Sequence, residues 1–118
     1  MSNKSVVVDV DGVLFEYHGW VNIDHYGDPI NENIEIINGL YNKGYDILIW
    51  TTRTNPRINA AYSQSELENK LFNKLKENGI LFTEIIKDPK PFFVCIIDDL
   101  SWNPTSKKYL SDFIKDIK

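Results

Sequence analysis

A run of apolar residues that ends in two aspartates constrains the fold of this chain more than any other feature. The run covers residues 6–14 and reads Val-Val-Val-Asp-Val-Asp-Gly-Val-Leu. Its β-branched start predicts a strand over about Ser5–Val10, buried on both faces as in a parallel sheet covered by helices. Ligands of open α/β sheets bind beyond the carboxyl ends of the strands, which is where Asp9 and Asp11 would lie. Two carboxylates at that place require a compensating cation, because burying an unpaired charge is costly.

The length and composition of the chain are those of one ordinary globular domain. With 118 residues, of which 42% are hydrophobic and 25% charged, we expect a single domain over residues 1–118. The net charge of −4 argues against electrostatic binding to nucleic acid or to an anionic membrane. No stretch has the roughly 18–20 apolar residues of a membrane span, and the first residues lack a signal-peptide pattern. A cytoplasmic location is therefore expected, where the lone Cys95 is read as a small buried hydrophobic residue.

Strand-like and helix-like patterns alternate along the chain. The predicted strands are Ser5–Val10, Tyr45–Thr51, Ile80–Ile86 and Phe92–Ile97. The first predicted helix is Asn31–Lys43, and the last begins at Pro104. The helix between them begins at a cap, either Ser63 or Ser65, and ends at about Asn78. The residues expected in the core include Ile34, Ile37, Leu40 and Tyr41 of the first helix and Trp50 of the second strand. This alternation predicts an α/β fold, a three-layer α/β/α sandwich around a parallel sheet with right-handed crossovers.

Polar residues follow three of the predicted strands, at the point where each strand ends. They are Asp9 and Asp11, then Thr51, then Asp98 and Asp99. Because the carboxyl ends of parallel strands lie along one edge of a sheet, we expect these side chains to converge. Clustered carboxylates repel one another unless a hard divalent cation lies among them, and a ligand set made only of oxygen suits Mg²⁺.

A lysine just before the last predicted strand adds a positive charge to this edge. Lys90 could neutralise a carboxylate or hold a phosphate as a point charge. Together with a threonine hydroxyl, backbone amides and Mg²⁺, it would complete a site for a tetrahedral dianion. A carboxylate beside such a site can attack phosphorus covalently, and a second carboxylate can protonate the leaving oxygen and later activate water.

These residues resemble the four motifs of the haloacid dehalogenase superfamily, in the same order and over about residues 6–100. The first motif is Asp9-Val10-Asp11-Gly12-Val13-Leu14, which is similar to D-x-D-G-V/T-L after an apolar strand. The second is the strand that ends in Thr51-Thr52-Arg53. The third and fourth are Lys90-Pro91 and the strand that ends in Asp98-Asp99. The chain is thus identified as resembling a small phosphatase-type member of this superfamily.

The resemblance implies a role for each matching residue. Asp9 would be the nucleophile that forms an aspartyl-phosphate, and Asp11 would be the general acid and base. Thr51 and Lys90 would bind the transferring phosphoryl group. The implied Mg²⁺ ligands are Asp9, the backbone carbonyl of Asp11, Asp98 and Asp99. Lys87 also precedes the last predicted strand, so the lysine assignment stays open between Lys90 and Lys87, with Lys90 preferred for its Lys-Pro pair.

Neither gap between the motifs has room for a folded cap domain, since each holds little more than one loop and one helix. We therefore expect an open site, covered, if at all, by a neighbouring subunit in a homo-oligomer. Thr52 and Arg53 follow the second motif and are the candidates for substrate binding. Trp20 and Trp102 are read first as rim-packing residues, His18 and His25 as ordinary loop residues, and Arg57 and Tyr17 as further residues that could shape specificity.

The expected function is therefore a Mg²⁺-dependent phosphomonoester hydrolase. A nucleotidase or a polynucleotide 3′-phosphatase-like activity is the alternative within the enzyme class, although the net negative charge disfavours a long polyanion. A non-catalytic binding module of the same fold is a second alternative. A phospho-acceptor receiver domain is a third, but receivers carry the phosphorylated aspartate on a middle strand, where this chain has Thr51.

Overall fold

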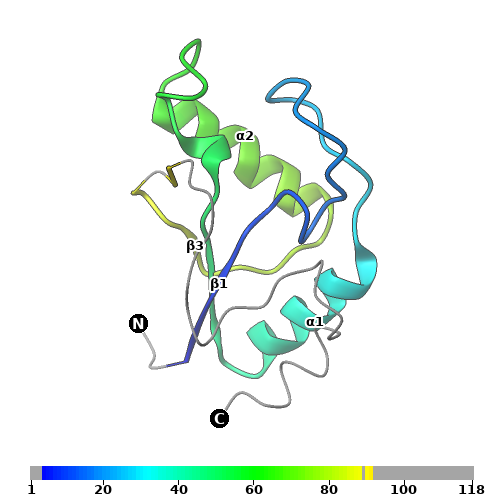
Figure 1. Ribbon diagram of the computed structural model, residues 1–118. Helices are drawn as coiled ribbons and strands as arrows, with labels where there is room; N and C mark the ends of the chain where they lie inside the picture. The colour runs from blue at the N-terminus through cyan, green and yellow to red at the C-terminus, as the bar shows by residue number, and fades with distance from the viewer. Residues whose placement is uncertain (1–3, 89, 92–118) are drawn as a thin grey trace.

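The computed structural model describes residues 4–88 and 90–91, which form a parallel three-stranded sheet with two α-helices and one short 3-10 helix (Figure 1). The elements in chain order are β1 (Ser5–Val8), α1 (Asn31–Asn42), β2 (Asp46–Ile49), η1 (Thr52–Thr54), α2 (Gln64–Glu77) and β3 (Glu84–Ile85). The predicted α/β class and parallel sheet are confirmed for this part of the chain. Outside the described residues lie the predicted strand Phe92–Ile97, the predicted helix from Pro104, and Cys95, Asp98, Asp99 and Trp102.

The sheet has the order β1-β2-β3, with β1 and β2 in register from Ser5 with Asp46 to Val8 with Ile49. Successive right-handed crossovers in this order place both helices on the same face of the sheet. One core cluster accordingly joins residues of α1 and α2 to Val8. Val7 points to the other face and is 55% exposed. The expectation that the first strand is buried on both faces is therefore correct for Val8 and wrong for Val7.

Helix α1 matches its predicted span within one residue. Ile34, Ile37 and Leu40 are buried, and the chain turns after the helix at Gly44, whose φ of +95° suits glycine alone. Tyr41 was expected on the same face but is 39% exposed. That part of the prediction is wrong even though a turn of about 100° per residue keeps Tyr41 on the same side as Ile34 and Ile37, so its exposure depends on what packs against the last turn of the helix.

Gly39 in the middle of α1 offers a test of how local propensity contributes to stability. A Cβ atom at Gly39 would meet no atom within 4 Å outside the helix's own backbone, so alanine fits there without strain. We expect Gly39→Ala to raise the free energy of unfolding by about 0.5–1 kcal/mol, because alanine loses less backbone entropy in a helix. Urea denaturation followed by circular dichroism measures the change. Gly44→Ala is the matched control, and it should destabilise because of the positive φ.

Helix α2 begins with a capping box at Ser63. The Ser63 hydroxyl accepts from the backbone N–H of Glu66 at 3.2 Å, and the Glu66 carboxylate accepts from the backbone N–H of Ser63 at 3.1 Å. Of the two predicted caps, Ser63 is thus the one used, and the helix ends before Gly79 as expected.

Among the described residues, no helix has the length and apolar character needed to cross a bilayer.

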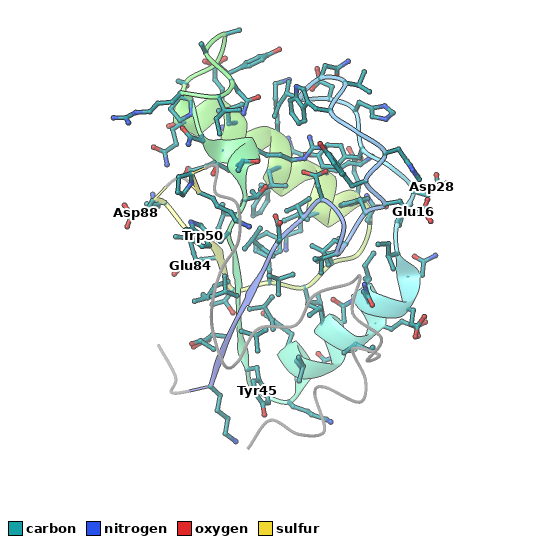
Figure 2. The ribbon with its side chains drawn as sticks, in the orientation of Figure 1. Glu16, Asp28, Tyr45, Trp50, Glu84 and Asp88 are labelled. Atoms are coloured by element: carbon teal, nitrogen blue, oxygen red, sulfur yellow. The ribbon has the colours of Figure 1, made fainter. Side chains whose placement is uncertain are left out.

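All three described strands are shorter than predicted, and β1 ends at Val8 instead of about Val10. β2 ends at Ile49, and Trp50 comes directly after it with its side chain only half-buried. The indole N–H of Trp50 donates to the backbone carbonyl of Asp88 at 3.0 Å, and Figure 2 shows the two residues near each other at the sheet edge. The expected core position of Trp50 is therefore wrong. β3 keeps only two residues of the predicted span Ile80–Ile86, while Ile80 itself is 1% exposed and belongs to the core.

Candidate active site at the strand ends

Asp9 and Thr51 lie beside each other in the sheet edge because β1 and β2 are parallel. Val8 is paired with Ile49, and the backbone N–H of Trp50 donates to the carbonyl of Val8 at 3.0 Å. Asp9 is thus one residue beyond the end of β1, and Thr51 is two residues beyond the end of β2. The two residues therefore follow neighbouring strands at the same edge of the sheet, and a contact between their side chains stays a prediction.

A lysine from a distant part of the chain contacts Asp9. The Lys90 ammonium nitrogen lies 3.1 Å from Asp9 Oδ2, and the other carboxylate oxygen accepts from the backbone N–H of Val10 at 2.7 Å. The Lys90 side chain is 10% exposed, whereas that of Asp9 is 37% exposed. Asp9 is therefore fixed by two contacts and still accessible. Of the two candidate lysines, the structure brings Lys90 to Asp9, while Lys87 is exposed.

Thr51 is buried at the start of the short helix η1. It is 1% exposed, and its hydroxyl oxygen accepts from the backbone N–H of Arg53 at 3.2 Å. A hydroxyl that accepts one hydrogen bond keeps its own hydrogen for donation. Donation from Thr51 to a phosphoryl oxygen stays a prediction, and Thr51 itself is not among the described residues that line the cavity.

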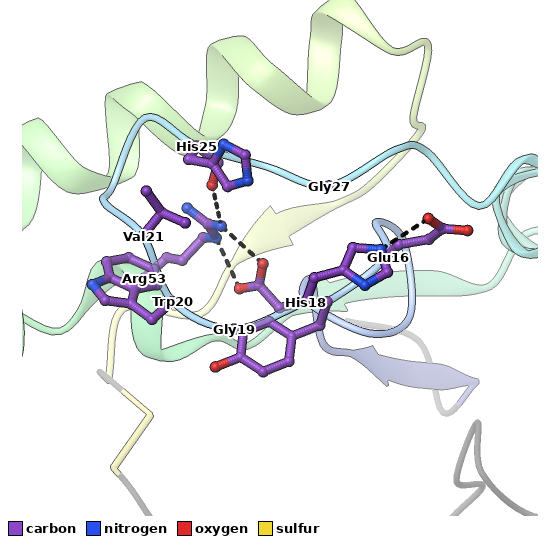
Figure 3. Close-up of a pocket in the computed structure, with 10 residues that line it drawn as sticks. Glu16, His18, Gly19, Trp20, Val21, His25, Gly27 and Arg53 are labelled. Atoms are coloured by element: carbon purple, nitrogen blue, oxygen red, sulfur yellow. Dashed lines mark hydrogen bonds and ion pairs between the residues drawn. The ribbon is translucent and has the colours of Figure 1, made fainter.

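Arg53 forms a two-pronged pair with Asp11, the second aspartate of the opening run. Its Nε and Nη2 atoms each lie 2.8 Å from an Asp11 carboxylate oxygen. Dashed lines in Figure 3 mark the hydrogen bonds of the Arg53 guanidinium. Arg53 is 3% exposed, so this is a buried ion pair of the strong bidentate type. Sequence reasoning placed Arg53 at the substrate and missed its contact with Asp11. The signal available was an arginine and a carboxylate that follow neighbouring strands.

The same guanidinium also binds the loop between β1 and α1. We call residues 15–28 of this loop the flap. Arg53 Nη1 donates to the carbonyl of Ile23 at 3.0 Å, and Nη2 donates to the carbonyl of His25 at 2.8 Å. Its Cζ lies 3.8 Å from the ring centre of Tyr26 and 5.1 Å from that of Trp20. Arg53 therefore joins the flap, Asp11 and the end of β2 into one unit.

Tyr26 keeps its proton beside this cation. Burial raises the pKa of the Tyr26 hydroxyl, and the positive charge of Arg53 opposes this effect only in part. The neutral ring packs edge-on against Phe15, with 5.1 Å between ring centres. The flap is thus anchored by an uncharged aromatic residue that covers one side of the Arg53 guanidinium.

The base of the flap is closed by backbone contacts. The N–H of Glu16 donates to the carbonyl of Asp28 at 2.8 Å, and both residues lie together at the edge of Figure 2. A Cβ atom at Gly27 would lie 2.0 Å from the Glu16 carbonyl oxygen, so glycine is required there. His18 pairs with Glu16 at 3.2 Å on the surface, which agrees with its interpretation as an ordinary loop residue.

A cavity of about 350 Å³ opens above the strand ends. Asp9 and Asp11 border it on the side of the sheet. The remaining described lining residues are Tyr17, Trp20, Thr52, Ile58 and Asn59. Figure 1 shows the flap and the segment between η1 and α2 both extending past the carboxyl ends of β1 and β2. Thr52, a candidate for substrate binding, therefore borders the cavity, whereas the Arg53 guanidinium binds Asp11 and the flap.

The described residues offer oxygen ligands that suit Mg²⁺, but only part of the implied set. No group of three His, Cys, Asp or Glu side chains that could hold a metal occurs in residues 4–88 and 90–91. Mg²⁺ needs only one or two protein carboxylates, since it retains several waters. The Asp9 side chain is 37% exposed, and the backbone carbonyl of Asp11 stays a predicted ligand. The predicted ligands Asp98 and Asp99 lie outside the described residues.

Comparison with known proteins gives one informative relative. No family model matches the chain, and no curated protein matches it. A structural-genomics target from Vibrio cholerae, known from a crystal structure, matches with a TM-score of 0.71 over 95% of this chain and 94% of that one. The two sequences are 21% identical, so the likeness shows a common α/β fold.

Proposed function

We propose that this protein is a Mg²⁺-dependent phosphatase of the haloacid dehalogenase type, with Asp9 as the nucleophile. The proposal includes a three-layer α/β/α fold without a cap domain and a cytoplasmic location. The observation that carries it is the pair between Asp9 and Lys90, with 3.1 Å between charged atoms, at the ends of parallel strands beside an open cavity. Asp9 is held by a buried lysine and keeps 37% of its side chain exposed at the cavity, so its carboxylate is both oriented and accessible to a substrate.

The reaction follows from the two aspartates. An Asp9 carboxylate oxygen attacks the phosphorus atom, and the bond between phosphorus and the leaving oxygen breaks. Asp11, which must first take up a proton and give up part of its pairing with Arg53, gives that proton to the leaving oxygen, which departs as an alcohol. Asp11 then takes a proton from a water molecule that attacks the aspartyl-phosphate, so that inorganic phosphate leaves and Asp9 is restored. Lys90 orients Asp9 and holds a phosphoryl oxygen in both steps.

Bound Mg²⁺ would neutralise the negative charge that the phosphoryl group and the aspartates bring together. Asp9 and the backbone carbonyl of Asp11 would hold it, with Asp98 and Asp99 as further proposed ligands. Thr51 is proposed to donate to a phosphoryl oxygen. Arg53 is not proposed to bind the phosphoryl group, because it is bound to both carboxylate oxygens of Asp11. To reach a leaving oxygen, Asp11 must exchange one of these two hydrogen bonds.

The direct test is hydrolysis of 4-nitrophenyl phosphate with and without Mg²⁺. We expect phosphate release that depends on Mg²⁺, stops with EDTA and returns when excess Mg²⁺ is added. Release of phosphate that continues unchanged in EDTA would contradict the metal requirement. The absence of hydrolysis for a panel of phosphate esters at saturating Mg²⁺ would favour the non-catalytic binding module instead.

A further inference from the structure

The cavity beside Asp9 is larger than a phosphoryl group needs. Its volume of about 350 Å³ lies in the range of sites that enclose a whole small ligand. Asp9 and Asp11 border it, and the rest of its described lining comes from the flap, from η1 and from the segment after η1. A substrate whose phosphoryl group meets Asp9 would therefore place its leaving group between Trp20, Tyr17 and Ile58.

Two large aromatic side chains remain exposed at this place. Trp20 is 49% exposed and Tyr17 is 56% exposed, although both border the cavity. Aromatic rings of this kind stack on planar ligand rings, and one stacking contact contributes about 1–3 kcal/mol in nucleic-acid binding proteins. A leaving group with a planar ring could stack on the exposed surface of Trp20 or Tyr17.

Arg53 holds the Trp20 ring in place for such a contact. The Arg53 guanidinium lies 5.1 Å from the ring centre of Trp20, within the range of a cation–π contact. Trp20 borders both the large cavity and a smaller one that Arg53 lines, and Figure 3 shows the indole beside the guanidinium. Trp20 is thus one of three residues, with Asp11 and Tyr17, that border both cavities, and Arg53 lines only the smaller one. A ring fixed before binding loses little entropy when a ligand stacks on it.

The charges around the cavity restrict the leaving group further. Among its described lining residues none is a lysine or an arginine, and the two charged ones are Asp9 and Asp11. Arg53 is a nearby cation, but it is bound to Asp11 and to the flap. A second phosphate would find no partner among these residues. An uncharged planar ring is the leaving group that matches both the aromatic side chains and the absence of cations among the described lining residues.

We infer that the large cavity is a leaving-group subsite for an uncharged planar ring, so that the substrate is a small phosphate monoester such as a nucleoside monophosphate. The inference rests on the proposed phosphatase function and adds the substrate class to it. It selects the nucleotidase from the alternatives left by the sequence. It excludes nucleic-acid 3′-phosphate ends, which carry further phosphates close to the reacting one.

The test compares two phosphate esters of ribose, one with a planar base and one without it. Adenosine 5′-monophosphate and ribose 5-phosphate share the same primary phosphate ester, so the chemical step is alike for both. We expect kcat/KM to be at least about tenfold higher for adenosine 5′-monophosphate. Trp20→Ala should lower kcat/KM about tenfold for adenosine 5′-monophosphate and less than about twofold for ribose 5-phosphate, because it removes one stacking contact. Trp20→Phe should restore most of the loss.

Val21→Ala is the matched control, because Val21 is the next residue of the flap, is 63% exposed and borders only the smaller cavity. It should leave both substrates unaffected. Equal kcat/KM values for the two substrates, or an equal loss for both in Trp20→Ala, would overturn the subsite. If neither substrate is hydrolysed with Mg²⁺, the phosphatase proposal fails. Calorimetric titration with adenosine then measures whether the large cavity still binds a planar ring. Binding that Trp20→Ala abolishes would support the subsite, and no binding to the native protein would overturn it.

Discussion

Asp9→Asn should lower kcat for phosphate ester hydrolysis by at least about 10³-fold, which corresponds to about 4 kcal/mol in the activation barrier. The amide has nearly the shape of the carboxylate, but its oxygen is neutral and does not form the aspartyl-phosphate. Lys90 would then face an uncharged group at the same position. Steady-state release of phosphate with Mg²⁺ present measures the effect. Circular dichroism and thermal unfolding show whether the fold is retained.

Asp28→Asn is the control for this substitution. Asp28 is an exposed aspartate at the base of the flap, and its backbone carbonyl accepts a hydrogen bond from the N–H of Glu16. We expect its activity to stay within about twofold of the native protein. If Asp9→Asn kept a third or more of the native kcat, Asp9 would not be the nucleophile, and the assignment of the first motif would have to be abandoned.

Arg53→Ala should affect both stability and the protonation of the leaving group. Removing Arg53 leaves the Asp11 carboxylate, whose side chain is 18% exposed, without its partner and releases the flap carbonyls of Ile23 and His25. We expect a loss of about 2–4 kcal/mol in the free energy of unfolding, less than for a fully buried pair. Arg53→Lys should recover only part of the loss, because an ammonium group lacks the two-pronged geometry. Urea denaturation measures these differences.

The catalytic effect of Arg53 should depend on the substrate. An alkyl phosphate such as ribose 5-phosphate needs a proton on its leaving oxygen, whereas 4-nitrophenol leaves without one. If Arg53 positions Asp11, Arg53→Ala should lower kcat/KM at least about tenfold for ribose 5-phosphate and only slightly for 4-nitrophenyl phosphate. Equal losses for both substrates would mean a structural role alone. Arg57→Ala, which removes an exposed arginine four residues further along, is the control and should change neither value.

Much of the fold follows from local patterns in the sequence. The apolar spacing in α1, the capping box at Ser63 and the glycines after both helices act over a few residues, so their effect is readable without the tertiary structure. The errors lie at boundaries. Trp50 and Tyr41 continue apolar patterns, and only the packing of neighbouring segments shows that Trp50 leaves the strand and that Tyr41 faces outward.

The choice between Lys87 and Lys90 shows a second limit of the sequence. Both lysines belong to an irregular segment with prolines at positions 89 and 91, where no periodicity relates one residue to the next. Lys90 contacts Asp9 because of the path that this segment takes after β3, across 81 positions of sequence. That path depends on contacts such as the hydrogen bond between Trp50 and Asp88, which no local pattern predicts.

The sequence by itself placed Asp9, Asp11 and Thr51 at the ends of parallel strands, because an apolar run and its polar end determine both where a strand stops and which edge of the sheet its last residues reach. Only the tertiary structure decided what surrounds them. The flap has no periodic pattern, so its aromatic residues and its carbonyl groups acquire positions only when Arg53 binds Asp11 on one side and the flap on the other. A buried charge must find partners wherever the fold supplies them, and this requirement turned Arg53 from a candidate for substrate binding into the residue that holds the site together.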